Sequence, residues 1–361
     1  MKHIQLAVLA MTPGIGHIKL RNLINHFGSV EILWQASANE LLTVEGIGEQ
    51  LCNNIVNNRK TTDIDKLAQK YEKLGVKIVG FGDDDYPYLL AQTYNPPTVL
   101  YYRGHLPIHE KMVAIVGSRR ATAYGRNVCQ MLAADLAAAG VVVVSGAARG
   151  IDSSAHLGAL EQGYTIAVVA NGVDISYPPE NAKLLSRISE NGAVVSEYPP
   201  GTQPQAGQFP ARNRIINGLA RGVVVIEAAE RSGALITVDF ALEEGRDIFA
   251  VPGSILSASS KGTNKLIKQG AKLVDCASDI LDEYGWTMLK QQEKTWELSA
   301  DEETVLSVLT YDTPITLDDI IETTQLPISR VAYVLIQLEF QGLIKESSGQ
   351  RYLRTARGGL R

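Results

Sequence analysis

Short runs of valine, isoleucine and alanine recur through the middle of this chain, and helix-like stretches lie between many of them. The clearest run is VVVVSG at 141–146, which enters the glycine-rich segment AARGIDSSAHLGAL. Runs this apolar predict strands buried on both faces, as in a parallel sheet covered by helices. Their alternation with helical stretches predicts a doubly wound, Rossmann-like α/β domain.

The expected Rossmann-like domain spans residues 70–285. Its predicted strands are VKIVGF, TVLYYRG, MVAIVG, VVVVSG, TIAVVA, AVVSEY, GVVVIEA, DIFAVPG and AKLVD. Helical stretches between them include GRNVCQMLAADLAAAG, PENAKLLSRISENG and GALITVDFALEEGR. Ligands of such sheets bind beyond the carboxyl ends of the strands, so the site is expected in the loops there.

Two further domains are expected on either side. Residues 1–65 predict a helical module in which two Gly-Ile-Gly turns separate apolar helices, as in helix-hairpin-helix or sterile-alpha-motif modules. Such modules bind the DNA backbone or serve for packing and protein contacts. Because no basic cluster lies beside the second turn, packing or protein contact is favoured. Residues 286–302 are polar and predict a linker.

Residues 303–355 predict a winged helix, with the helices DDIIETTQ and SRVAYVLIQLEFQG and the hairpin LIKESSGQRYLR. The second helix is the one that would enter a major groove, and Arg330 is its single cation. Reading a duplex requires several cations and polar base readers. The composition of this helix therefore favours a protein contact over duplex recognition.

The charge of the chain is unevenly distributed. Its 361 residues carry a net charge of -5, so any site for a polyanion has to be local. Three segments lack Asp and Glu but contain several Lys or Arg: 111–134, 198–226 and 248–274. They predict one assembled electropositive surface, and the alternative is that they are solvated helix faces.

Cysteine usage and the length of the apolar runs narrow the class of protein. Cys52, Cys129 and Cys276 are scattered and odd in number, which predicts reduced thiols, with neither a disulfide framework nor a zinc site. No segment is long enough to span a bilayer, and the N-terminus lacks a convincing cleavage site. We expect a cytoplasmic protein with no metal and no other cofactor.

The loops after the third and fourth predicted strands carry the first candidate site residues. They are Ser118, Arg119, Arg120, Gly146, Arg149 and Gly150. A glycine-rich turn between a strand and a helix usually holds a phosphate, yet this spacing is neither that of a dinucleotide fold nor that of a P-loop. The adjacent strand ends predict an extended groove rather than one small pocket.

The segment FPARNR, at 209–214, adds an aromatic side chain to these cations. Phe209 precedes a proline, which predicts an extended conformation, and Arg212, Asn213 and Arg214 follow at a helix start. An aromatic ring beside guanidinium groups suits unpaired nucleotides, because a base stacks while its phosphate is neutralised. The alternatives are that Phe209 is a core residue and that Arg214 pairs with an acid such as Glu197 or Glu227.

Catalysis finds little support in the sequence. Asp152 and His156 are four residues apart on one predicted helix, where they could form a base–acid pair. No Ser or Cys is placed as their nucleophile, and no third residue completes a metal site. We therefore expect Asp152 to cap the helix, His156 to pack, and the protein not to be an enzyme.

Six stretches resemble the DNA-processing protein A family (DprA, also called Smf), in the order of that family. They are VAIVGSRRATAYG, VVVVSGAARGIDSSAHLGAL, TIAVVANGVDISYPPENAKL, VVSEYPPGTQPQAGQFPARNRIINGLA, VVVIEAAERSGALITVDFALEEGRDIFAVPG and KGTNKLIKQGAKLV. The resemblance implies a protein that binds single-stranded DNA, protects incoming strands in natural transformation, helps load the recombinase RecA, and forms a homodimer through its Rossmann-like domain. The family's DNA groove corresponds here to Arg119, Phe209 and Arg212, with Lys183 as the nearest basic candidate and Lys261 as a further one.

Two other functions compete with this interpretation. Rossmann-like nucleotide hydrolases of the lysine-decarboxylase-like group use a PGGxGTxxE motif, whose nearest counterpart here is 232–237. The glycine pattern and the spaced glutamate of that motif are missing. A mononucleotide sensor is the third possibility. Release of base or phosphate from nucleoside monophosphates would favour the enzyme.

Overall fold

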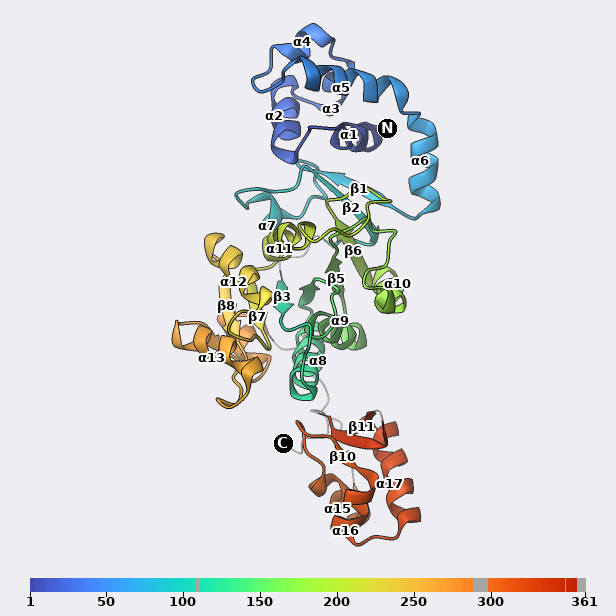
Figure 1. Ribbon diagram of the computed structural model, residues 1–361, viewed down its shortest axis with the longest axis vertical. Helices are drawn as coiled ribbons and strands as arrows, with labels where there is room; N and C mark the ends of the chain where they lie inside the picture. The colour runs from blue at the N-terminus through green and yellow to red at the C-terminus, as the bar shows by residue number, and fades with distance from the viewer. Residues whose placement is uncertain (108–110, 288–297, 348, 356–361) are drawn as a thin grey trace.

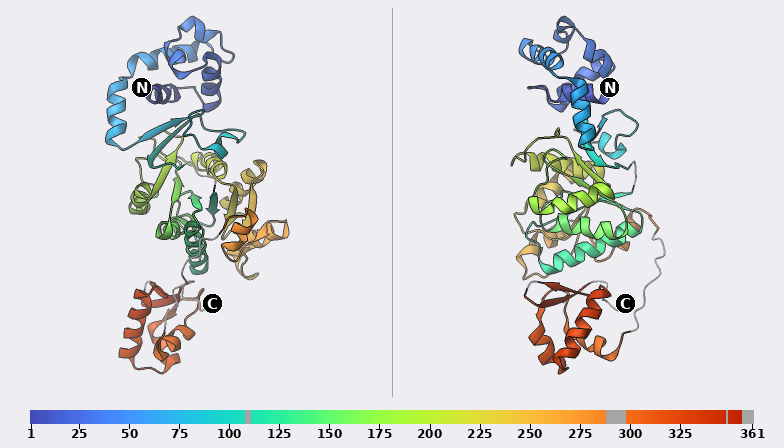
Figure 2. Two further views of the ribbon diagram at one scale, coloured as in Figure 1. Left: turned by 180° about the vertical axis from the view of Figure 1, so that it is seen from behind. Right: turned by 90° about the vertical axis from the view of Figure 1, so that its right-hand side faces the viewer.

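The computed structural model of the chain describes residues 1–107, 111–287, 298–347 and 349–355. A helical module, a central sheet domain and a smaller C-terminal unit follow one another along its long axis (Figures 1 and 2). Within the described ranges, no helix combines the length and the apolar character needed to cross a membrane. The domain boundaries given above remain predictions.

The central domain is built on a nine-stranded sheet in the order β1-β2-β6-β5-β4-β3-β7-β8-β9. The strands are β1 (Lys77–Gly80), β2 (Val99–Gly104), β3 (Met112–Val116), β4 (Val142–Ser145), β5 (Thr165–Val168), β6 (Gly192–Ser196), β7 (Gly222–Val225), β8 (Asp247–Ala250) and β9 (Lys272–Leu273). All nine predicted strands are present. From β6 to β9 the pairing is parallel, whereas β1 and β2 form an antiparallel edge.

Helices cover both faces of this sheet (Figure 1). They are α7 (Tyr88–Ala91), α8 (Ala123–Ala138), α9 (Ile151–Gln162), α10 (Ala182–Glu190), α11 (Gln208–Leu219), α12 (Gly233–Glu243), α13 (Lys261–Lys268) and α14 (Ser278–Glu283), with short 3-10 turns η1 (Pro179–Asn181) and η2 (Ala258–Ser260). Side chains of α8, α9 and α14 share one apolar cluster with β3 and β4, and those of α11 and α12 share another. The predicted doubly wound architecture is thus confirmed, and it gathers the loops after β3, β4, β5 and β7 at one edge.

The N-terminal module consists of α1 (Lys2–Ala10), α2 (His17–Phe27), α3 (Val30–Gln35), α4 (Ala38–Leu42), α5 (Glu49–Thr61) and α6 (Ile64–Lys73). The two predicted turns precede α2 and α5, and Gly14 and Gly46 within them have left-handed φ values of 88° and 81°. Leu6 and Tyr71 belong to one apolar cluster with Tyr101 of the sheet. The module is therefore packed onto the central domain, and α6 continues past residue 65, where the sequence placed the end of the module.

The C-terminal unit is a winged helix, as predicted. It comprises α15 (Ala300–Val308), β10 (Ile315–Thr316), α16 (Leu317–Thr324), α17 (Ile328–Phe340), β11 (Ile344–Ser347) and β12 (Arg351–Arg354). Strand β12 pairs with both β10 and β11. Its core contains the predicted apolar face of α17, formed by Val331, Val334, Leu335 and Leu338. Most of the predicted linker, residues 288–297, lies outside the described residues.

Candidate nucleic-acid interface

The loops after β3, β4 and β5 and the first turn of α11 enclose a small pocket of about 40 Å³. Its lining residues are Arg119, Gly146, Ala148, Arg149, Val169, Ala170, Asn171, Tyr177, Pro178 and Phe209. Four predicted site residues therefore meet here, although they come from three separate segments of the chain. The volume is far below the roughly 300–1,000 Å³ of a typical small-molecule site, so the pocket suits one part of a longer ligand.

A cation and two aromatic rings line one side of this pocket. The Arg119 guanidinium carbon lies 5.4 Å from the centre of the Phe209 ring. The centres of the Phe209 and Tyr177 rings are 5.6 Å apart, and the two ring planes are tilted by 48° to each other. Arg119 is exposed, and Tyr177 is 41% exposed. Arg119, Phe209 and Tyr177 thus form a strip that offers aromatic surface to a base and a guanidinium to the neighbouring phosphate.

Phe209 differs from its prediction in backbone conformation. It lies in the first turn of α11, which begins at Gln208, whereas the sequence predicted an extended conformation before Pro210. The helix can include Pro210 because N–H groups in a first turn need no helical partner. Phe209 is half-buried, so it is neither a core residue nor a freely exposed ring.

Arg149 lies on the exposed side of the pocket and forms an ion pair with Glu180. Both side chains are at least half exposed, at 65% and 50%. Exposed ion pairs contribute about 0–1 kcal/mol, so a phosphate can compete with Glu180 for this guanidinium. Arg149 is therefore well placed to contact an anion.

Arg212, by contrast, lies beneath the pocket. Its side chain is 4% exposed, and Nη1 donates hydrogen bonds to the backbone carbonyls of Gly146, at 2.6 Å, and Val168. Burial lowers the pKa of the guanidinium to about 10, so it is still charged at neutral pH. The prediction that Arg212 lies in the groove is therefore corrected, because its guanidinium is used inside the protein.

The close approach of Arg212 explains one glycine of the loop. A Cβ atom at Gly146 would lie 2.1 Å from Nη1 of Arg212 and 2.6 Å from Oδ2 of Asp152. Any other residue would displace one of these two side chains. Gly146 therefore contributes to the site by giving space to a buried cation.

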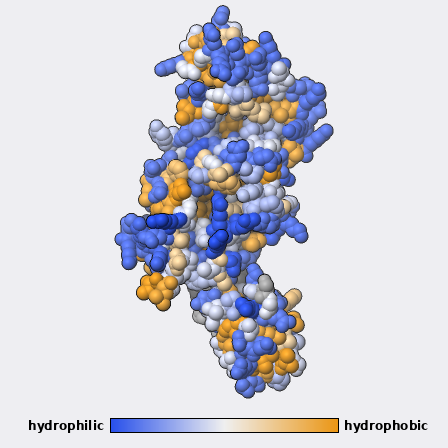
Figure 3. Space-filling view, in the orientation of Figure 1, coloured by the Kyte–Doolittle hydropathy of each residue, from blue (hydrophilic) through white to orange (hydrophobic). Residues whose placement is uncertain are grey.

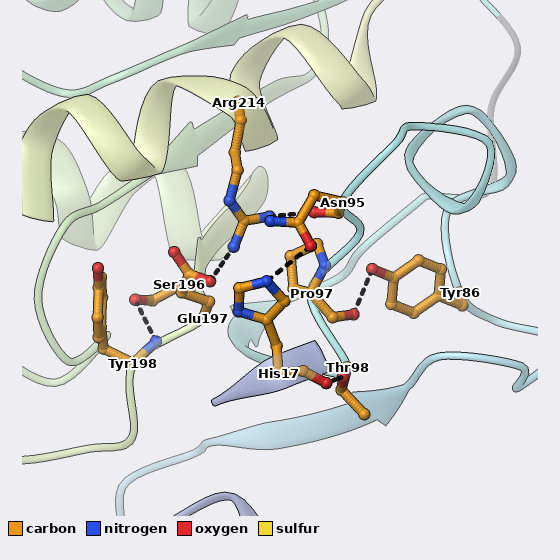
Figure 4. Close-up of polar contacts among 9 residues, drawn as sticks. All are labelled: His17, Tyr86, Asn95, Pro97, Thr98, Ser196, Glu197, Tyr198 and Arg214. Atoms are coloured by element: carbon orange, nitrogen blue, oxygen red, sulfur yellow. Dashed lines mark hydrogen bonds and ion pairs between the residues drawn. The ribbon is translucent and has the colours of Figure 1, made fainter. Parts of the chain in front are cut away.

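Arg214 does not line the pocket, and Figure 4 shows its guanidinium directed at Glu197 and Asn95. It forms an ion pair with Glu197 and donates a 2.7 Å hydrogen bond to the Asn95 carbonyl. The Asn95 side chain in turn bonds His17 of the N-terminal module at 2.7 Å. The predicted alternative of an ion pair with Glu197 is thus what the structure shows, while Glu227 accepts a hydrogen bond from the loop after β3.

The other predicted residues do not line the pocket. Lys183 is exposed in the first turn of α10, and Lys261 is exposed at the start of α13, beyond β8. Arg120 is exposed, and its backbone N–H donates to the Ser118 hydroxyl at 3.1 Å. Asn213 and Gly150 are half-buried. Three of the cations are thus accessible outside the pocket.

Asp152 and His156 are both buried inside the protein. Asp152 is the second residue of α9, and the N-cap of that helix is Gly150, so the prediction that Asp152 caps the helix is wrong. The Asp152 carboxylate instead accepts a hydrogen bond from the Ala148 N–H at 3.3 Å. Burial lowers the pKa of His156 to about 3, and its Nδ1 lies 2.7 Å from the Thr165 hydroxyl. These contacts agree with structural roles for both residues.

Three residues of the site were missed from the sequence. Tyr177 had a signal in the sequence, because it is an aromatic residue that precedes a proline in a loop after a strand. Asn181 and Ser153 carry no such signal, because their importance lies in the carbonyls that they bind. The hydrogen bonds that these two side chains donate are described in the last section of the Results.

Comparison with known proteins is consistent with this architecture. Residues 77–285 match the model for DNA recombination-mediator protein A, and residues 290–350 match that of the DprA winged helix domain. Protein Smf of Synechocystis is 34% identical over 385 residues, covering 96% of this chain and 97% of the relative.

Two solved structures are also similar. DNA processing protein A of Streptococcus pneumoniae is 36% identical with a TM-score of 0.69, over 78% of this chain and 98% of that one. The Helicobacter pylori protein, described for its unique single-stranded DNA binding mode, is 30% identical with a TM-score of 0.52, over 58% of this chain and 95% of that one. The chain described here belongs to the DNA-processing protein A (DprA/Smf) family.

Proposed function

We propose that this protein binds single-stranded DNA at the edge of the sheet where β3, β4 and β5 end. The observation that carries the proposal is the Arg119–Phe209–Tyr177 strip beside Arg149, which pairs cations with stacking surface. Such a combination tolerates any base, because every base has a face that stacks. The single-stranded DNA binding described for the Helicobacter pylori relative supports the same ligand.

The biological role that we infer is DNA processing in natural transformation. In this role the protein covers incoming single strands and helps to load the recombinase RecA, and both steps place it in the cytoplasm. Membership of the family supports this role.

We also propose that two copies associate through the central domain. Strand β9 forms an edge of the sheet, and exposed edges readily pair with another chain. Exposed apolar side chains lie in α12, in the loop after β8 and in β9: Ile236, Leu242, Ile255, Leu256 and Leu273. Figure 3 shows separate apolar patches on this side of the molecule, with hydrophilic surface between them. Leu273→Lys is expected to shift the protein from dimer to monomer in light scattering.

A nucleotide-processing enzyme is the weaker alternative. Residues 232–237, the segment nearest to a hydrolase motif, make structural hydrogen bonds. The Ser232 hydroxyl caps α12 by accepting from the Ala234 N–H, and the Thr237 carbonyl accepts from the Asn217 side chain. Asp152 and His156 are buried away from any substrate. Incubation with nucleoside monophosphates is therefore expected to release neither base nor phosphate.

Gel-shift titrations with single- and double-stranded oligonucleotides at two salt concentrations test the proposal. Single strands are expected to bind more tightly, and their log–log salt dependence to have a slope of about -0.7 per neutralised phosphate. Equal affinity for the two forms, or no binding to either, would reject this function.

A further inference from the structure

Three consecutive carbonyl groups of the loop after β4 are bound by side chains from the protein interior. The Gly146 carbonyl accepts from Arg212 at 2.6 Å, the Ala147 carbonyl from Asn181 at 2.9 Å, and the Ala148 carbonyl from Ser153 at 2.7 Å. The donors come from α11, η1 and α9. Three distant segments thus fix the orientation of three successive peptide groups.

Two of the three donors, Asn181 and Ser153, are also hydrogen-bonded to each other. Nδ2 of Asn181 lies 2.9 Å from the Ser153 hydroxyl, which itself donates to the Ala148 carbonyl. Asn181 is 9% exposed, and Arg212 is 4% exposed. Because these donors are shielded from water, a carbonyl that lost its partner would have no ready replacement.

The backbone conformation of this loop needs such support. Ala147 has a φ of 53°, in the left-handed region that residues other than glycine rarely adopt. Strained residues of this kind persist where their surroundings determine them, and they cluster at functional sites. Hydrogen bonds to the carbonyls on both sides of Ala147 and to its own carbonyl hold it in place.

The orientation of the carbonyls determines where the amides point. In a planar trans peptide the N–H lies opposite the preceding C=O, so the Arg149 N–H lies opposite the Ala148 carbonyl that Ser153 holds inward. Ala148 and Arg149 both line the pocket. Successive backbone N–H groups in such conformations form concave sites for anions.

We propose that Asn181, Ser153 and Arg212 are positioning residues for a phosphate contact made by the main-chain amides of residues 149 and 150, since the Ala148 N–H already donates to Asp152. This proposal rests on the proposed binding of single-stranded DNA and deepens it. The side chains of Asn181 and Ser153 do not touch the strand. They keep the loop in the one shape in which its amides face a phosphate oxygen, while Arg212 adds positive charge from beneath.

Salt dependence separates this role from a direct ionic contact. A neutral amide releases no counterion, so losing its phosphate contact weakens binding by the same factor at every salt concentration. Loss of a Lys or Arg contact also makes the log–log slope less steep, by about 0.7 for single strands. Positioning residues and ionic contacts therefore leave different signatures.

The experiment uses the full-length protein and fluorescent oligo-dT in anisotropy titrations between low and moderate salt. Asn181→Ala and Ser153→Ala are each expected to weaken binding about fivefold to tenfold at every salt concentration, with the wild-type slope. Ser153→Thr, which keeps the hydroxyl, is expected to recover most of the affinity. Asn191→Ala, at the exposed end of α10, is the matched control and should bind like the wild type.

Several results would overturn the proposal. It is wrong if Asn181→Ala and Ser153→Ala both bind like the wild type, or if their loss of affinity comes with a less steep slope. Hydrogen exchange of the wild type decides the case in which a variant does not fold. Oligo-dT should slow exchange of the amides of residues 149 and 150, and unchanged exchange there rejects the contact. Absence of wild-type binding would instead reject the proposed function itself.

Discussion

The rim of the central sheet, where β3, β4 and β5 end, and the exposed face of α17 are two places where this fold could meet DNA, and their side chains differ. At the rim, Arg119 and Arg149 are exposed beside aromatic rings, above a loop held by buried polar side chains. On α17 four of the exposed residues carry large apolar side chains, Ile328, Tyr333, Ile336 and Phe340, and the other exposed residues are Ser329, Arg330 and Glu339. Arg330, the one cation of that helix, pairs with Asp301 at 3.0 Å.

This difference shows that the fold alone does not define the ligand. The second helix of a winged helix enters a major groove in many DNA-binding proteins, where it relies on cations and polar base readers. Between residues 298 and 355 the sequence contains nine Asp or Glu and only four Lys or Arg. We therefore propose that nucleic acid binds at the rim, and we expect α17 to contact a protein rather than a DNA duplex.

Arg212→Ala should have the largest effect, on stability. It leaves Asp152 buried without the cation that acts on it most strongly, and it removes the guanidinium donor of two carbonyls. The free energy of unfolding should therefore fall by about 3–5 kcal/mol at pH 7. Urea denaturation measures the loss. Arg120→Ala, at an exposed position of the same rim, is the control and should change stability by less than about 0.5 kcal/mol.

The same variant has an expected pH dependence. Burial raises the pKa of Asp152 and Arg212 opposes this, so removing Arg212 raises that pKa further. A carboxyl whose folded-state pKa lies above its unfolded value stabilises the fold at low pH, and this contribution is lost as the pH rises through the folded pKa. The deficit should therefore be smaller at pH 5 than at pH 7; an equal deficit would contradict the buried-charge explanation.

Arg119→Ala should give the next largest effect, on affinity. Losing a charged contact to a phosphate costs about 2 kcal/mol, which is roughly a 30-fold weaker binding of oligo-dT. The salt slope should also become less steep by about 0.7. Arg330→Ala removes a cation from α17 and is expected to leave both quantities unchanged. Equal losses in the two variants would remove the distinction between the rim and α17.

Phe209→Ala should weaken binding by about 1 kcal/mol or somewhat more, because one base loses its stacking partner. The salt slope should stay at the wild-type value, since no charge is removed. Phe340, which is 92% exposed on α17, provides the matched aromatic control. Anisotropy titration of both alanine variants is the measurement, and a Phe340→Ala loss as large as that of Phe209→Ala would count against the assignment.

Cations of the wing should give the smallest effect. Lys345→Ala and Arg351→Ala remove two exposed charges from β11 and β12. Affinity for duplex DNA is expected to change less than about twofold, because each contributes at most a distant, screened charge. A selective tenfold loss of duplex binding in a gel shift would show that the winged helix does read DNA.

The strands and the winged helix could be predicted because their signals are local. Runs such as MVAIV and GVVV identify buried strands by themselves, and the spacing of Val331, Val334, Leu335 and Leu338 identifies the inner face of a helix. The convergence of Arg119, Arg149 and Phe209 followed from the rule that parallel strands place their carboxyl ends together.

The depth of individual side chains could not be predicted in this way. Arg212 and Arg214 lie in one motif with the residues that line the pocket, yet one binds carbonyls under the loop and the other binds Glu197. Their burial depends on space that distant residues provide, such as the missing Cβ of Gly146. Asn181 was missed for the same reason, because its partner lies 34 residues earlier in the chain.

Photochemical crosslinking with an oligo-dT that carries one 5-iodouracil tests the central claim most directly. Mass spectrometry of the crosslinked peptides identifies which residues lie against an unpaired base. We expect crosslinks at Phe209 or Tyr177, and their loss when oligo-dT without the label is added in excess. Crosslinks confined to α17 or to the N-terminal module, with none at the rim, would contradict the assignment of the single strand to the edge of the sheet.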